Sequence, residues 1–202
     1  MNAQARQRAS VLAVLAAMAL VVLDAGLVNV ALPVMGASLR VAPGEAVLTI
    51  SAYQTALVMG LLPSAHAAEK FGYKRLFLGG LSLFSAASIL CGFAPTLGAL
   101  VVARVLQGLG GAAIMALGIA LLRFALGAER LGQAIGWNAL NVALCSAAGP
   151  IVGALILSIA PWPWLFFAKM PVIAVALTAS FALREVAPHR SRIEADSPIA
   201  PS

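Results

Sequence analysis

Residues 11–35 read VLAVLAAMALVVLDAGLVNVALPVM, and Asp24 is the one charged residue among them. A helix needs about 20 mainly apolar residues to cross a hydrocarbon core of about 30 Å. The stretch therefore predicts a transmembrane helix. Arg6 and Arg8 precede it, as in a signal peptide. However, the apolar run resumes after Asp24 and continues to Met35 without a cleavage site and a polar mature start, so a first membrane helix is favoured.

Five further apolar runs follow, separated by short polar breaks. They exceed the length of tilted barrel strands and show no two-residue alternation, so each is expected to be helical. The chain is 62% hydrophobic and only 10% charged, against about 25% charged in soluble domains. The sequence predicts an all-α polytopic membrane protein with spans at residues 10–35, 46–67, 76–93, 97–122, 131–159 and 164–183.

The charged residues lie mostly in the breaks, and their distribution predicts the orientation. Cytoplasmic loops carry an excess of Lys and Arg. One side of the six spans collects Arg6, Arg8, Lys70, Lys74, Arg75, Arg123, Arg130, Arg184, Arg190 and Arg192, and the other side has Arg40, Lys169 and Arg104. We therefore expect a multi-pass protein of the plasma (inner) membrane with both termini cytoplasmic. Its predicted parts are an N-terminal segment (1–9), a membrane domain (10–183) and a disordered tail (184–202).

Composition also argues against several classes of function. A net charge of +6 would suggest a nucleic-acid partner in a soluble protein, but here the cations are topology determinants, so none is expected. Cys91 and Cys145 are far apart in sequence and give no metal spacing. His66 and His189 form no His-Glu-x-x-His motif. We expect no enzyme activity, no metal and no cofactor.

Asp24 is the first candidate functional residue, because it interrupts an apolar helix with no cation within a helical turn. A charge there costs about 3 kcal/mol. The carboxyl can relieve this cost by binding a proton, by pairing with a cation on another helix, or by facing water. Each option gives a proton-linked or cation-binding group. The alternative is a carboxyl that only packs helices together.

Arg104 is the expected partner of Asp24. Arg104, Gln107, Gly108 and Gly111 share one helical face. The two glycines would let another helix approach closely, while Arg104 and Gln107 supply hydrogen-bond donors. An arginine stays charged at any working pH, so a nearby carboxylate could gain or lose a proton beside it. The alternative is an interfacial arginine whose side chain reaches the lipid headgroups.

The fifth run carries a stripe of small or polar residues at three- and four-residue spacing: Asn138, Asn141, Cys145, Gly149 and Gly153. Pro150 has no amide hydrogen, so we expect a kink beside Gly149. A kink together with a small-residue face predicts a close-packed, bendable helix, although packing alone could explain the same pattern.

A charged turn, EKFGYKR at residues 69–75, joins the second and third runs. Gly72 permits a tight reversal, and Glu69 lies near Lys74 and Arg75. An ion network at the cytoplasmic surface is one interpretation, but positive-inside loops often look similar.

Taken together, these sites resemble the major facilitator superfamily, and specifically its fourteen-helix drug:proton antiporter branch. Residues 23–33 resemble L-D-x-T-I-V-N-V-A-L-P, and residues 65–74 resemble G-x-x-x-D-R-x-G-R-R with several replacements. Residues 104–108 match R-x-x-Q-G. Residues 136–153 resemble the helix-five antiporter motif, and residues 162–171 resemble W-R-W-x-F-x-x-N-x-P, with Lys169 in place of Asn.

The resemblance implies the N-terminal half of a transporter, built from two inverted three-helix repeats. Asp24, Arg104 and Gln107 would serve proton coupling and substrate binding. Glu69, Gly72, Lys74 and Arg75 would gate, and the helix with Asn138, Asn141, Gly149, Pro150 and Gly153 would favour antiport.

The expected activity is proton-coupled efflux of apolar or cationic small molecules by alternating access. Its partners would be the lipid bilayer, protons, substrate and a second six-helix half, supplied by a homodimer or a separate chain. The alternative is a non-transporting truncated fragment or a regulatory membrane subunit of transporter ancestry.

Overall fold

The structure is a computed structural model that describes residues 3–180, and these residues are helical without strands. The longer helices are α1 (Ala3–Leu39), α3 (Leu48–Phe71), α4 (Tyr73–Gly92), α5 (Leu97–Leu126) and α6 (Leu131–Ile159). Shorter ones are α2 (Pro43–Ala46), η1 (Ala128–Arg130), α7 (Trp164–Phe167) and α8 (Met170–Ser180). The five long helices have the length and composition to cross a membrane, and the segment Trp164–Ser180 is a shorter apolar helix. The all-α membrane fold expected from the sequence is confirmed.

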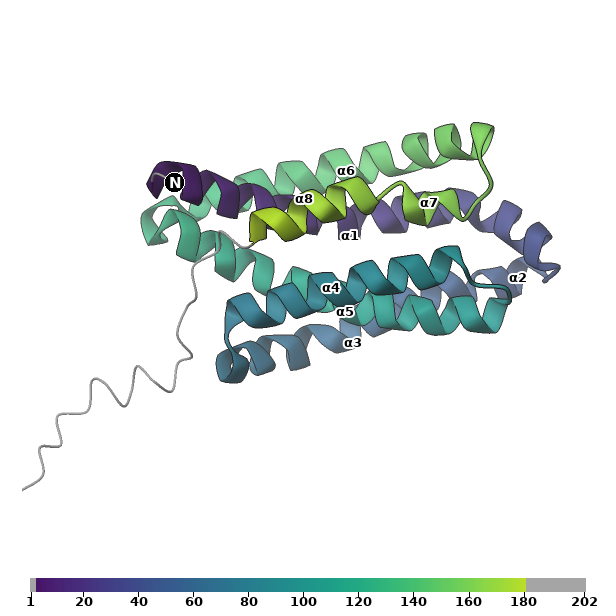
Figure 1. The fold of residues 1–202 in the computed structure, drawn as a ribbon, viewed down its shortest axis with the longest axis horizontal. Coiled ribbons are helices and arrows are strands. Elements are labelled where there is room, and N and C mark those ends of the chain that lie inside the picture. Colours follow the sequence, from purple (N-terminus) through teal and green to yellow (C-terminus); the bar gives the residue numbers. More distant parts are fainter. Residues whose placement is uncertain (1–2, 181–202) are drawn as a thin grey trace, which may run out of the picture.

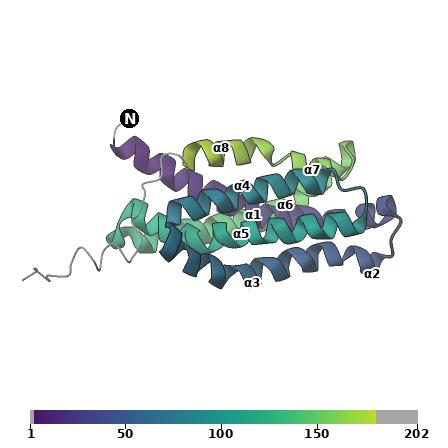
Figure 2. The same ribbon diagram turned by 60° about the horizontal axis from the view of Figure 1, so that its bottom comes forward.

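The helices pack as two groups of three (Figures 1 and 2). In one group α5 packs against both α3 and α4, and in the other α1 packs against α6 and α8. Contacts between α1 and α5 join the two groups. Residues on α1 and α5 therefore meet in the interior, at the junction of the two groups.

Small residues allow the close approach of α5 to its neighbours. A Cβ atom at Gly108 would lie 2.4 Å from the carbonyl oxygen of Tyr53 on α3. A Cβ at Gly110 would lie 2.6 Å from the backbone nitrogen of Phe84 on α4. Both distances are too short for a real carbon atom, so only glycine fits where these backbones touch. The expected role of glycines in close packing thus holds for Gly108.

The predicted sixth span differs most from the structure, because it is split into α7 and α8 by a turn at residues 168 and 169. Pro171 offers a physical reason. It has no amide hydrogen to donate to the carbonyl of Phe167, so one bond of a continuous helix is missing. Lys169 lies at this break. The last predicted residues of this span and the tail at 184–202 lie outside the described residues.

The ends of the helices agree with the expected alternation of crossings. The start of α1, the α3–α4 turn, the α5–α6 turn and the end of α8 lie at one end of the bundle (Figure 1). Gly72, with φ +94°, is the sole residue between α3 and α4. The charged turns therefore share one end with the N-terminus. That this end is cytoplasmic stays a prediction.

Candidate functional site

A buried polar cluster lies at the junction of α1 and α5. Asp24 on α1 and Arg104 and Gln107 on α5 all have side chains with no exposed surface. The guanidinium of Arg104 forms an ion pair with Asp24 through Nη1 and Oδ2. Of the three ways in which the sequence allowed Asp24 to be stabilised, the structure thus has the cation on another helix.

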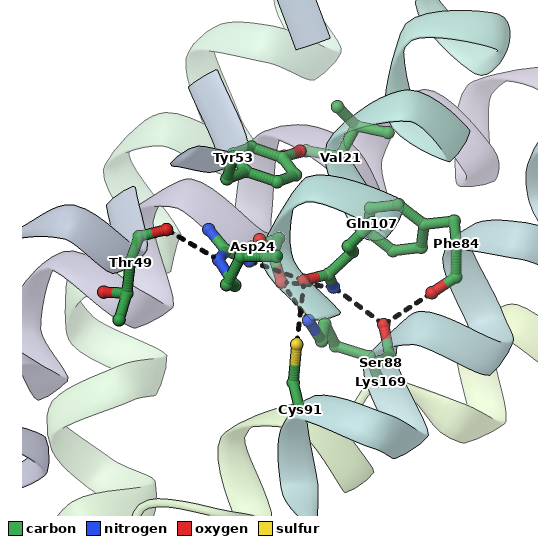
Figure 3. A network of polar contacts seen from close by, with 10 residues as sticks. Val21, Asp24, Thr49, Tyr53, Phe84, Ser88, Cys91, Gln107 and Lys169 are labelled. Carbon is green, nitrogen blue, oxygen red and sulfur yellow. Dashed lines mark hydrogen bonds and ion pairs between the residues drawn. The ribbon is translucent and has the colours of Figure 1, made fainter. Parts of the chain in front are cut away.

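Gln107 holds the cluster together by using both ends of its amide. Its Nε2 donates to Oδ1 of Asp24 at 3.0 Å and to Oγ of Ser88 at 2.8 Å. Its Oε1 accepts from Nη1 of Arg104 at 2.6 Å and from Sγ of Cys91 at 3.6 Å. A glutamine amide offers two donors and one acceptor oxygen, so the side chain is fully engaged. Figure 3 shows Gln107 between Asp24 and Ser88.

Residues of α3 and its N-terminus fix the orientation of Arg104. Its Nε donates to the carbonyl oxygen of Thr49 at 3.2 Å. The guanidinium carbon lies 4.1 Å from the centre of the Tyr53 ring, a cation–π contact. Tyr53 is itself held by a hydrogen bond from its hydroxyl to the carbonyl oxygen of Val21, at 3.2 Å. The interpretation of Arg104 as a surface-reaching arginine is therefore wrong.

Lys169 is a second cation on the same carboxylate. Its ammonium pairs with Oδ1 of Asp24, and the side chain is only 4% exposed. The nitrogen lies 4.8 Å from the ring centre of Phe166 and 5.6 Å from that of Phe84. The placement of Lys169 among the surface topology charges is wrong, because the α7–α8 break turns it into the interior (Figure 3).

The cluster has more positive than negative charge. Asp24 contributes one negative charge, and Arg104 and Lys169 contribute one positive charge each. Nη2 of Arg104 is buried and has no hydrogen-bond partner among the described residues. A buried charge is tolerated mainly when it is paired, so this imbalance distinguishes the cluster from a simple structural ion pair.

Lys169 and the residues around Arg104 were missed as site residues. The available signal for Lys169 was the one used for Asp24, namely a single charge inside an otherwise apolar run. Tyr53, Ser88 and Thr49 gave no comparable signal, because polar residues of these types are common in membrane helices. Their role depends on which helices pack together.

The stripe on α6 packs against α1. Asn141 donates from Nδ2 to the carbonyl oxygen of Leu15 at 3.0 Å. A Cβ at Gly149 would lie 3.0 Å from Cα of Gly26, and one at Gly153 would lie 3.3 Å from the carbonyl oxygen of Leu27. The helix continues through Pro150. The structure thus gives these residues a packing contact, while their role in antiport stays a prediction.

Two further observations concern the remaining predicted residues. Oδ1 of Asn138 is buried and unpartnered among the described residues.

The predicted gating residues lie at the α3–α4 turn, away from the cluster at the α1–α5 junction. There Glu69 and Arg75 are exposed, Lys74 is half-buried and Gly72 is buried. The structure therefore does not bring the gating residues together with Asp24.

The comparisons with known proteins agree with the fold. Residues 14–201 match the family model described as Major Facilitator Superfamily. This chain belongs to the major facilitator superfamily.

Several relatives have names that point to transport rather than to an enzyme. The uncharacterized transporter YebQ of Escherichia coli is 39% identical over 91% of this chain and 40% of its own length. The tetracenomycin C resistance and export protein of Streptomyces glaucescens is 33% identical, over 86% of this chain and 32% of its own. The putative multidrug resistance protein MdtD of Salmonella typhi is 33% identical, over 80% and 34%. The chain spans two fifths or less of the length of these relatives.

Proposed function

We propose that this chain forms one half of a proton-coupled antiporter that exports small molecules by alternating access. The observation that carries the proposal is the buried cluster of Asp24, Arg104 and Lys169 at the junction of the two helix groups. Ionisable residues within membrane spans are rare and usually functional. The names of two relatives, which refer to export or multidrug resistance, support the direction and the kind of substrate.

The geometry suggests how a proton could be coupled to movement. Asp24 on α1 binds Arg104 on α5 and Lys169 at the α7–α8 break, so one carboxylate connects three segments. A proton on Asp24 would weaken both ion pairs at once. The three segments could then separate, which is the kind of change that alternating access requires. Proton entry can supply about 1.4 kcal/mol per pH unit and about 2.3 kcal/mol per 100 mV.

A second six-helix half, as a second copy or a separate chain, is part of the proposal. Transporters of this kind bind substrate between two such halves. The relatives are more than twice as long as the matched region, which is consistent with this requirement. The sequence left both apolar and cationic substrates open. The excess positive charge of the cluster disfavours a cation, so of these two an uncharged molecule is favoured.

The test is proton-driven dye uptake into inverted vesicles that contain the full chain, with an uncharged and a cationic dye. We expect uptake of the uncharged dye that collapses when the proton gradient is dissipated and is absent in Asp24→Asn. Gly79→Ala is the matched control, because a Cβ at Gly79 meets no atom within 4 Å, and it should behave as the wild type. Inserted, folded protein that moves neither dye would overturn transport by copies of this chain alone, and would favour either a half that needs a separate chain or a non-transporting fragment or subunit.

A further inference from the structure

Lys169 pairs with Oδ1 of Asp24, an oxygen that a cationic ligand could otherwise approach. Its ammonium is enclosed by Asp24 and by the rings of Phe84 and Phe166. Aromatic faces attract a desolvated ammonium by about 2 kcal/mol or more. Lys169 is thus held in an aromatic and acidic pocket of the kind that could otherwise receive a cationic ligand.

The oxygens of Asp24 are already occupied. Oδ2 accepts from Arg104, and Oδ1 accepts from both Lys169 and Gln107. The carboxylate offers about four lone-pair positions, and its single negative charge is already opposed by two positive ones. An incoming cation would be repelled by the net positive charge and could reach Asp24 only by displacing Arg104 or Lys169.

The two cations differ in how firmly they are held. Arg104 has three hydrogen-bond acceptors, on Asp24, Gln107 and Thr49, and its guanidinium stacks on Tyr53. Among the described residues, Asp24 is the one acceptor found for the ammonium of Lys169. A lysine ammonium is also a compact charge on a flexible stem, whereas the guanidinium fork of arginine is preorganised. Lys169 is therefore the cation that a ligand would have to displace.

We propose that Lys169 is a tethered cation that occupies Asp24 and excludes positively charged substrates from it. The substrates bound at this cluster then carry no net positive charge. The inference rests on the proposed function, since it concerns the substrate class of the same site. Lys169 would then determine which substrates bind, by keeping positively charged molecules away from Asp24.

The experiment measures equilibrium binding of two fluorescent probes to the full chain in lipid nanodiscs. The probes are a quaternary ammonium dye and an uncharged dye of the same size. In Lys169→Gln the carboxylate loses its tethered cation, so we expect the ammonium dye to bind about tenfold more tightly or better. The affinity for the uncharged dye should not rise in parallel, so the ratio of the two affinities should shift about tenfold towards the ammonium dye.

Two matched variants separate charge from shape. Lys169→Arg keeps the positive charge and should bind the ammonium dye as weakly as the wild type. In the double variant Asp24→Asn/Lys169→Gln the carboxylate is also absent, so the gain should disappear. Size-exclusion profiles and circular dichroism establish that each variant is folded.

A folded Lys169→Gln chain that gains no affinity for the ammonium dye overturns the inference. So does a wild-type chain that binds this dye as tightly as Lys169→Gln and loses it in Asp24→Asn. The measurement needs no proton gradient. A gain in dye affinity without proton-driven uptake would therefore count against antiport by copies of this chain alone while leaving the role of Lys169 intact.

Discussion

The charge balance of the cluster predicts that Asp24 and Lys169 contribute very differently to stability. Asp24→Asn leaves Arg104 and Lys169 buried with no negative partner. Removing one partner of a buried ion pair typically costs about 3–5 kcal/mol. Lys169→Met instead leaves Asp24 paired with Arg104 and removes the excess positive charge. Because Asp24 keeps Arg104 as its partner, Lys169→Met leaves no unpaired charge and removes the desolvation cost of the lysine, so little or no loss of stability is expected.

The expected changes in unfolding temperature follow from these energies. In a chain of this size 1 kcal/mol corresponds to about 2–4 °C. Asp24→Asn should therefore lower the midpoint by about 6–20 °C, whereas Lys169→Met should leave it unchanged or raise it. In the double variant only Arg104 lacks a partner. Asp24→Asn should therefore cost at least about 1.5 kcal/mol less when Lys169 is already methionine.

The assay is thermal unfolding of the purified chain in detergent, followed by tryptophan fluorescence. Trp162 is 6% exposed, so its emission should change when the helices separate. Gly79→Ala serves again as the neutral reference. Equal costs of Asp24→Asn in the two backgrounds would refute the charge argument, because they would mean that Lys169 and Asp24 do not interact. A large loss of stability in Lys169→Met would refute it as well.

Two further predictions concern packing. Gly108→Ala should destabilise the chain by about 1–3 kcal/mol, because its Cβ would meet the Tyr53 carbonyl. Gly98→Ala, on the same helix, is the control, because its Cβ would meet no atom within 4 Å. The assay compares their unfolding midpoints in detergent, and equal midpoints would contradict the close approach of α3 and α5. Asn141→Ala should lower the free energy of unfolding by about 1 kcal/mol, because it removes the hydrogen bond to the carbonyl oxygen of Leu15. The same unfolding assay measures this change, and an unchanged midpoint would argue against the α1–α6 contact.

The pairing of Asp24 with Arg104 could be predicted from the sequence. A lone carboxylate and a lone arginine in apolar helices each need a partner, because lipid provides none. The need of Asp24 for a partner could be predicted from the sequence. Arg104 could be predicted as that partner, because few charged residues lie inside the predicted spans. The supporting contacts of Gln107 with Ser88 and Cys91 could not be predicted, since they depend on how α4 is rotated against α5.

The membrane class, the helical fold, five of the six spans to within several residues and the Asp24–Arg104 pair could all be predicted from the amino-acid sequence. These follow from hydropathy and from the cost of isolated charges, both of which are properties of local composition. The place of Lys169 in the cluster, by contrast, depends on how the helices pack. Lys169 lies 145 positions from Asp24, and its direction is set by the break between α7 and α8 and by the packing of α8 on α1. Hydropathy records that a residue is charged, but only the packing of the helices determines which charge it meets.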